Sequence, residues 1–562
     1  MADPRRPILA QQFDLAVRAF RDGWHILRYR GPSQIQFWFI ALVIGIAAGF
    51  GALGFRMGID ALQAWLYGTE DVQRLHSYAE HLPWYWILLI PVAGGLIVGV
   101  ILHLFTPDGR VRAVADVIEG AAMGNGRVEK RAGFASIAAS LITLGSGGSS
   151  GREGPVVHMA GVMSTWISNR IHADGITGRD LLGCAVAAAV SASFNAPIAG
   201  ALFALEVVLR HFAVHAFAPI VIASVAGTVI SRMEYGDVTE FVLTTPGSLQ
   251  FYVELPAFLI LGLLSGLIAV LLMRGIFLAE DVGSQLQGWL HLPRWLRPGV
   301  SGAMLGGLAI FFPHIIGVGY ETTSLALSGA FPLREAIVFA LVKALAVAIT
   351  FGGRMGGGVF SPSLMVGALS GLAFGLVATG VLPDVSGTST LYAFAGMGAV
   401  AAAVLGAPIS TTMIVFELTG DWQIGIAVMA SVSLSTALAS RLVDRSFFLT
   451  QLERRGIHLA AGPQAYLLAM LRAGAVMRPV TDPRCAEEGP CREMVAQGLC
   501  IEASATLEAA MPIFDRAEVD FVPVILRGTD EAPPEILGAL YQIDALKAYN
   551  RALAATAAEE HS

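Results

Sequence analysis

Residues 145–155 read GSGGSSGREGP, a glycine- and serine-rich stretch that ends around the carboxylate of Glu153 and lies between long apolar segments. A flexible backbone that leads into a helix start leaves unpaired N–H groups, and these groups together with the helix dipole make an anion site. An ionisable group in such apolar surroundings is a functional candidate by default. We therefore predict that Glu153 lies where an anion would bind. The alternative is a carboxylate that only caps the following helix.

The composition is that of a membrane protein. Hydrophobic residues make up 55% of the 562 residues and charged residues 14%, with a mean hydropathy of +0.65, whereas soluble domains average about 25% charged residues. We therefore expect the lipid bilayer as a partner. The net charge of −7 follows no patterned face, so no nucleic-acid partner is expected. Cysteines without CxxC spacing indicate reduced thiols and no metal site.

Two basic segments predict the orientation of the chain in the membrane. Residues 1–34 combine arginines with apolar residues near helical spacing and predict a cytoplasmic amphipathic helix. The loop 110–131 is also basic, and positive charge marks the cytoplasmic side. Between them we expect two spans, 37–55 and 84–105. The expected location is the inner (plasma) membrane, with both termini cytoplasmic.

The apolar segments beyond residue 130 are different in character. Many are too short, or too interrupted by Gly and Pro, to cross a bilayer as simple helices of about 20 residues. Broken helices are tolerated in lipid only where they line a cavity or pack inside protein, and they mark binding sites. The expected segments are 131–144, 154–168, 178–192, 196–210, 216–231, 251–273, 297–312, 331–350, 361–380, 390–404, 407–419 and 424–441.

An internal repeat supports the same conclusion. AVAAAVSASFNAPIAGALFALEV (185–207) resembles GAVAAAVLGAPISTTMIVFELTG (398–420), with Pro197 and Pro408 in matching places. GGSSGREGP has a looser partner in GGRMGGGVFSP, and both pairs lie about 205 to 211 residues apart. Alanine-rich membrane helices can resemble one another by chance, but the shared AP that precedes a helix carrying a glutamate argues for an inverted repeat with its site between the halves. The expected halves are 84–232 and 251–441.

Four motifs, GREGP (151–155), FNAPIAGALFALE (194–206), GGVFSP (357–362) and GAPISTTMIVFELTG (406–420), together resemble the CLC family of chloride channels and proton/chloride antiporters. The resemblance covers about residues 35–455. It implies an all-α polytopic membrane domain with broken and tilted helices. It also implies a homodimer with one anion pathway in each subunit and with its contact formed by residues 196–231 and 406–440.

The resemblance assigns roles to residues of both halves. Glu153 falls on the external gating glutamate, whose carboxylate occupies the anion site until it is protonated or displaced. Its neighbours in GREGP and the GGVFSP stretch are expected to surround the anion, with the backbone N–H groups rather than the side chains as donors in the second stretch. The anion-site residues expected from these two motifs are Gly151, Arg152, Gly154, Val359 and Phe360.

The inner gate departs from the family. Arg112 stands where the family usually has a serine hydroxyl, and Phe447 or Phe448 where many relatives have a tyrosine. Arg112 and Phe448 therefore complete the expected anion site without hydroxyl donors. Arg112 could attract anions or plug the pathway. Alternatively it is a cytoplasmic arginine that snorkels and follows the positive-inside rule.

The inner proton relay is lost as well. Family antiporters usually have two consecutive glutamates where this chain has Glu206 and Val207. A valine carries no proton, so the sequence predicts weak or absent proton coupling by the usual route. Glu206 is expected to make hydrogen bonds at a helix end. His158 is either a substitute relay or a packed polar side chain, and its position off the helical face of Glu153 favours packing.

The C-terminal part resembles a single, small α/β CBS-like cytoplasmic module at 475–551, after a linker at 456–474 and before a tail at 552–562. The family signature for nucleotide phosphate and ribose appears as Gly538, Tyr541 and Asp544, without its hydroxyl donor. Nucleotide binding is therefore doubtful, no other cofactor is expected, and a dimer-stabilising or regulatory role is the more economical interpretation.

Three functions remain open from the sequence. The leading one is transport of chloride or a similar monovalent anion, channel-like or weakly proton-coupled. The second is proton-coupled antiport of chloride, nitrate or fluoride. The third is an intramembrane enzyme, which would need paired catalytic groups at membrane depth. The sequence contains no HExxH motif, no Ser/His/Asp set and no second carboxylate suited to act with Glu153, so we expect no enzyme.

Overall fold

The computed structural model describes residues 34–69, 71, 74–212, 214–236, 251–384, 386–457, 459, 467–517, 519–526 and 535–561. The chain divides into two compact units. The large unit comprises the described residues up to Leu209 and Phe217–Arg455, and the small unit comprises Arg210–Ala216 and the described residues from Gly456 on. The expected amphipathic helix at 1–34 lies almost entirely outside the described residues.

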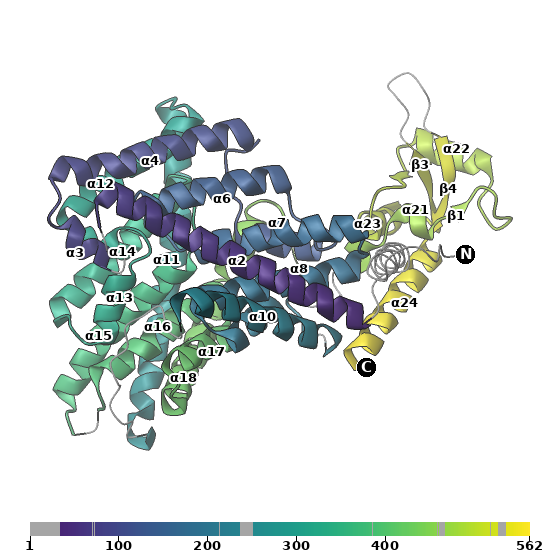
Figure 1. Cartoon of the computed structure of the whole chain (residues 1–562). Helices are drawn as coiled ribbons and strands as arrows, with labels where there is room; N and C mark the ends of the chain where they lie inside the picture. The colour runs from purple at the N-terminus through teal and green to yellow at the C-terminus, as the bar shows by residue number, and fades with distance from the viewer. Residues whose placement is uncertain are drawn as a thin grey trace, which may run out of the picture. The chain divides into compact units, whose positions relative to one another are not determined.

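The secondary-structure elements of the large unit are all helices within its described residues (Figure 1). Its first part contains α2 (Gln34–Tyr67), α3 (Leu75–Ala79), α4 (Trp84–Phe105), α5 (Val114–Ala122), α6 (Lys130–Gly145), α7 (Glu153–Ile171), α8 (Gly175–Phe194), α9 (Pro197–Phe203), the π-helix η2 (Ala204–Leu209) and α10 (Val214–Tyr235). Its second part contains α11 (Phe251–Trp289), η3 (Arg294–Leu296), α12 (Arg297–Phe311), η4 (Pro313–Ile315), α13 (Tyr320–Leu327), α14 (Leu333–Gly352), α15 (Phe360–Val381), α16 (Ser389–Leu405), α17 (Pro408–Thr419), α18 (Trp422–Leu442) and α19 (Phe447–Glu453).

The long helices confirm a multi-pass membrane architecture. Within the described residues, seven helices are long and apolar enough to cross a bilayer. The span expected at 84–105 coincides with α4, whereas α2 is longer than the expected 37–55 because the helix continues through polar residues at its C-terminal end. The short helices α5, α13 and α19 were not among the expected segments. Each is shorter than the window over which apolar periodicity becomes readable.

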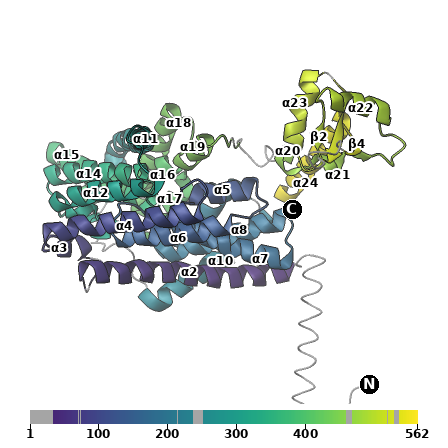
Figure 2. The same cartoon turned by 90° about the horizontal axis from the view of Figure 1, so that it is seen from above.

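Small residues let these helices approach closely, as is common between helices in membranes. A Cβ atom added to Gly371 of α15 would lie 2.3 Å from the carbonyl oxygen of Tyr392 of α16. A Cβ atom added to Gly99 of α4 would lie 1.8 Å from the carbonyl oxygen of Trp295. Figure 2 shows α2 near one side of the large unit and α11 with α18 near the opposite side, where these two helices pack together.

Corresponding helices of the two halves begin at matching residues. α7 starts at Glu153 and α15 at Phe360, each with proline as its third residue, and α9 and α17 start at Pro197 and Pro408. Proline suits the first turn of a helix because its missing N–H would have no intrahelical partner there. The interrupted helices expected from the repeat are therefore present at the expected places.

The small unit contains a four-stranded sheet in the order β1-β4-β3-β2. β3 pairs antiparallel with β4, β4 antiparallel with β1, and β2 parallel with β3. This mixed α/β architecture fits the expected CBS-like module. The elements are α20 (Leu467–Met470), α21 (Ala473–Val476), β1 (Arg478–Pro479), α22 (Glu488–Ala496), β2 (Ile501–Glu502), α23 (Leu507–Ala517), β3 (Phe521–Leu526), β4 (Glu535–Tyr541) and α24 (Gln542–His561).

The boundaries of this unit differ from those expected. Leu468, Leu471 and Ala473 belong to its hydrophobic core, so part of the expected linker at 456–474 is inside the folded unit. At the other end, α24 continues as one helix to His561 rather than ending before a tail at 552–562. Both differences arise because short apolar runs and an alanine-rich end carry no boundary signal of their own.

Candidate functional site

The starts of α7 and α15 are joined by a two-residue bridge between the halves of the repeat. The backbone N–H of Gly151 donates to the carbonyl of Gly358, and the N–H of Gly358 donates to the carbonyl of Gly151, both at 2.7 Å. The hydroxyl of Ser150 also donates to the carbonyl of Gly356 at 3.0 Å. These bonds hold two helix N-termini next to each other, and each brings N–H groups without intrahelical partners.

The glycines of this bridge are required by its geometry. A Cβ atom on Gly151 would lie 2.5 Å from Glu153 Oε2 and 3.1 Å from the backbone N of Ser361. Gly357 has φ +132°, a conformation that L side chains rarely adopt, and a Cβ atom there would lie 2.0 Å from the Ser150 hydroxyl oxygen. The glycine-rich motifs therefore leave room for the Glu153 carboxylate beside the first turn of α15.

Glu153 is buried, with 4% of its surface exposed. Its Oε1 accepts a short hydrogen bond from the hydroxyl of Ser361, the second residue of α15. Its Oε2 has no hydrogen-bond partner among the described residues. The residue is the first of α7, but its carboxylate bonds to the other half of the repeat, so it is more than a cap of its own helix. A carboxylate at this place is stabilised by the positive end of the α15 dipole.

Arg152 is the charged neighbour of this carboxylate. Its guanidinium is buried, donates from Nη2 to the carbonyl of Ser193 at 2.7 Å, and lies 5.1 Å from the ring centroid of Tyr320. The backbone of Gly154 lies against Gly358. The four GREGP residues expected at the site are thus clustered at the bridge. One guanidinium nitrogen of Arg152 is already hydrogen-bonded to the backbone of α8.

Val359 and Phe360 occupy the start of α15, as N-cap and first helical residue, and both are buried. The ring of Phe360 packs edge-on against Phe194, with centroids 4.8 Å apart, and against Phe203, with centroids 6.2 Å apart. The side chain of Phe360 is therefore a packing residue. Any contact of Val359 or Phe360 with an anion would come from their backbone N–H groups, as the sequence predicts.

The side chain of Arg112 lies in an ion-pair cluster. Its guanidinium donates to Asp108 at 2.7 Å and to Glu129 at 3.1 Å, it lies 3.8 Å from Asp116, and the side chain is only 11% exposed. Partial burial would raise the pKa of Asp108, but the hydrogen bonds and charges of Arg112 and Arg110 hold it below its ordinary value. The positive charge expected at the inner edge is thus balanced locally by carboxylates.

The other residues expected at the inner gate, and the expected relay position, are apolar. Phe448 is buried and touches Phe447, whose ring stacks on Phe277 with centroids 5.1 Å apart. Val207 is buried in η2, a helix type that is often found at functional sites. Positions 447 and 448 carry no hydroxyl, and position 207 carries no acid.

His158 is buried on α7, and neither ring nitrogen has a hydrogen-bond partner among the described residues. Its Nε2 lies close to α6, 2.9 Å from where a Cβ atom of Gly133 would be. The ring therefore packs against α6, which agrees with the position off the helical face of Glu153, and whether it also carries protons stays a prediction.

Ser361 and Lys343 were not predicted from the sequence as functional residues. Ser361 was visible only as the polar residue of GGVFSP, and nothing in the sequence links it to Glu153. Lys343 of α14 is fully buried, and its ammonium donates to the carbonyls of Gly317 at 3.0 Å and Ile315 at 3.3 Å. A single lysine within an apolar helix was the available signal for it.

Comparison with known proteins gives a consistent result. A family model described as voltage gated chloride channel matches residues 94–440. A ClcB-like chloride channel protein of Ralstonia nicotianae is 31% identical over 394 residues, which cover 69% of this chain and 90% of that protein. The H(+)/Cl(−) exchange transporter ClcA of Vibrio vulnificus is 29% identical over 456 residues, which cover 78% of this chain and 94% of that protein. The crystal structure of a slow cyanobacterial Cl−/H+ antiporter matches with a TM-score of 0.66 and 22% identity, over 75% of this chain and 98% of that one.

Proposed function

The chain belongs to the CLC family of voltage-gated chloride channels and transporters, and on this premise we propose that it carries chloride or a similar monovalent anion through a pathway gated by Glu153. It is a multi-pass membrane protein and not an enzyme. The observation that supports the gate is the position of the Glu153 carboxylate at the first turn of α15, bonded to Ser361.

The proposed gating follows from competition between the Glu153 carboxylate and the transported anion for the same position at the start of α15. A carboxylate and a halide are both anions, and both are stabilised by N–H groups and by the positive end of a helix dipole. Because the two cannot occupy the start of α15 together, the bound side chain closes the pathway. Protonation removes the charge that holds the carboxylate there, and a high anion concentration displaces it. Anion flux should therefore depend on pH.

We further propose that transport is channel-like or only weakly coupled to protons. Val207 offers no titratable group at the position where antiporters of the family usually have the inner glutamate. The named relatives include both a chloride channel protein and an exchange transporter, so proton-coupled antiport of chloride, nitrate or fluoride is the second candidate. The observation that favours it is His158, a buried imidazole on the same helix as Glu153.

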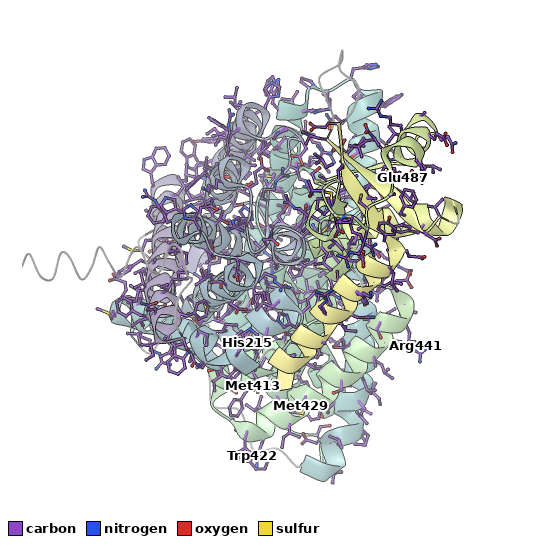
Figure 3. All side chains as sticks on the ribbon, turned by 90° about the vertical axis from the view of Figure 1, so that its right-hand side faces the viewer. His215, Met413, Trp422, Met429, Arg441 and Glu487 are labelled. Atoms are coloured by element: carbon purple, nitrogen blue, oxygen red, sulfur yellow. The ribbon has the colours of Figure 1, made fainter. Side chains whose placement is uncertain are left out.

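A homodimer is proposed on the family resemblance, with a contact formed by α9, α10, α17 and α18. α17 packs against both α9 and α18, and large apolar side chains are exposed on these helices. Figure 3 labels Met413 on α17 together with Trp422 and Met429 on α18, and the last two are 62% and 55% exposed. Exposed apolar side chains can face either lipid or a second subunit. Measuring the oligomeric state of the protein in detergent therefore tests the proposed homodimer.

We propose that the protein lies in the inner (plasma) membrane with both termini in the cytoplasm, because the loop 110–131 is basic.

For the CBS-like unit we propose a dimer-stabilising or regulatory role without nucleotide binding. Arg478 supports this, because its Nε donates to the Asp544 carboxylate at 2.6 Å and its guanidinium lies 4.0 Å from the Tyr541 ring centroid. The carboxylate that would hold a ribose is thus already paired.

A liposome flux assay tests the proposed function. The purified protein is reconstituted, a gradient of chloride, nitrate or fluoride is imposed, and anion and proton movements are recorded together. Chloride flux that rises on acidification, without stoichiometric proton movement, supports a gated channel-like protein. Proton movement in fixed proportion to anion movement would favour the antiporter, and the absence of flux for all three anions would reject anion transport.

A further inference from the structure

The anion site has lost both side-chain hydroxyls that the family usually places at its inner edge, since Arg112 and Phe448 occupy those positions. Where the two halves meet, Ser361 nevertheless presents a hydroxyl to the Glu153 carboxylate. Ser361 is 4% exposed, and its hydroxyl donates to Glu153 Oε1. The hydroxyl of Ser361 comes from α15. The hydroxyls that relatives usually carry correspond to positions 112, before α5, and 448, in α19.

Ser361 breaks the symmetry of the repeat at this point. The bridge pairs Gly151 with Gly358, and the residue three places further on is Gly154 in the first half and Ser361 in the second. Gly154 offers only its backbone, whereas Ser361 adds an O–H donor next to its own N–H group. Only the second half therefore carries a side-chain donor in the first turn of its helix.

We propose that the Ser361 hydroxyl is a side-chain donor of the anion site, binding the Glu153 carboxylate when the pathway is closed and a monovalent anion when the carboxylate has left. The proposal rests on the gate described above and adds its specificity-determining residue. A hydroxyl is suited to both tasks because its O–H rotates about the Cβ–Oγ bond and follows whichever acceptor is present.

Two structural features argue that the hydroxyl faces the site rather than its own helix. Ser363, two residues on, donates back to the carbonyl of Phe360 at 2.6 Å, as buried serines in helices commonly do. Ser361 does not bond in this way but reaches the carboxylate of the other half. The second carboxylate oxygen, Oε2, is also buried and has no hydrogen-bond partner among the described residues, so the space beside this turn holds a second oxygen atom besides the one bonded to Ser361.

The test uses the full-length protein with Glu153→Gln, in which the neutral side chain no longer competes for the site. Chloride binding is measured by isothermal titration calorimetry in this parent and after adding Ser361→Ala. Ser363→Ala is the matched control, because Ser363 lies in the same turn, is also buried, and bonds only to its own helix. We expect Ser361→Ala to raise the Kd for chloride about tenfold, the typical effect of losing a hydrogen bond to a charged group, and Ser363→Ala to leave it within about twofold.

Thermal unfolding provides a second measurement that does not depend on heats of binding. Chloride should raise the melting temperature of the parent and of the Ser363→Ala protein, but raise that of the Ser361→Ala protein less, because a ligand stabilises the folded state by RT ln(1 + [L]/Kd), which falls as Kd rises. Equal chloride affinity in the Ser361→Ala and Ser363→Ala proteins would overturn the proposal. The gate itself is judged separately, by whether Glu153→Gln alone abolishes the pH dependence of flux.

Discussion

Glu206 and Glu417 form a reciprocal pair of caps: Glu206, in η2 directly after α9, caps α17, and Glu417, in α17, caps α9. The Glu206 carboxylate accepts the N–H groups of Ile409 and Ser410 at the start of α17, at 2.9 and 2.7 Å. The Glu417 carboxylate accepts the N–H groups of Ile198 and Ala199 at the start of α9, at the same two distances. This reciprocal pair joins the halves of the repeat a second time, apart from the glycine bridge, and it assigns Glu206 the helix-end role expected from the sequence.

Removing either carboxylate should destabilise the large unit. Glu417→Ala leaves two N–H groups at a helix start without acceptors, and hydrogen bonds to a charged group contribute about 1.5–3 kcal/mol each. We expect a loss of at least about 2 kcal/mol, seen as a lower melting temperature in detergent, and a similar loss for Glu206→Ala. Glu335→Ala, at an exposed first-turn position of α14, is the control and should change little. Equal melting temperatures for all three variants would contradict the capping role.

Helix starts that depend on neighbouring residues could be predicted from the sequence, whereas contacts between the two halves could not. The helix starts at Pro197, Pro408 and Glu153 were predictable because proline and glycine act on the chain next to them. The bond from Ser361 to Glu153 was not, because it exists only after Gly151 pairs with Gly358 from the other half. A repeat indicates that two segments are alike, but it does not give the atoms through which they meet.

The surroundings of Arg112 show the same limit. The sequence placed an arginine in a motif that usually has serine, and this left an attractor, a plug and a snorkelling side chain equally open. Which acids pair with it depends on how the loop between α4 and α5 folds back towards Glu129 at the end of the next loop. Charge spacing along a loop carries no periodicity from which such pairs could be predicted.

Glu153→Gln should abolish the pH dependence of anion flux. The neutral amide has no charge to hold it at the start of α15, so flux should be high and nearly the same at acidic and neutral pH. The measurement is chloride efflux from liposomes across that pH range, with Glu335→Gln as the control that keeps the wild-type profile. A pH profile in the Glu153→Gln protein that matches the wild type would rule out this gate.

Because position 207 is a valine, we expect that an outward chloride gradient does not drive protons uphill through the wild-type protein. The position holds no titratable group, so a proton released from Glu153 has no acceptor on the usual inner route. The measurement is proton movement in lightly buffered liposomes after a chloride gradient is imposed. Stoichiometric pumping would defeat the prediction, and its disappearance in the His158→Ala protein would assign the relay to that histidine instead.

Arg112→Ser should slow anion flux at low ionic strength. The substitution removes one cation from the cluster of Asp108, Asp116 and Glu129, in which Arg110 and Arg455 remain. The cluster becomes more negative by one charge and then repels anions that approach this side. The difference should shrink in high salt, because exposed charges are screened beyond a Debye length of about 8–10 Å. Arg127→Ser is the control. Arg127 lies in the same basic loop as Arg112, but it donates to the side chain of Asn169 and to the backbone carbonyl of Ala173. Faster flux in the Arg112→Ser protein would indicate a plug, and equal, negligible effects of both substitutions would mean that Arg112 only snorkels.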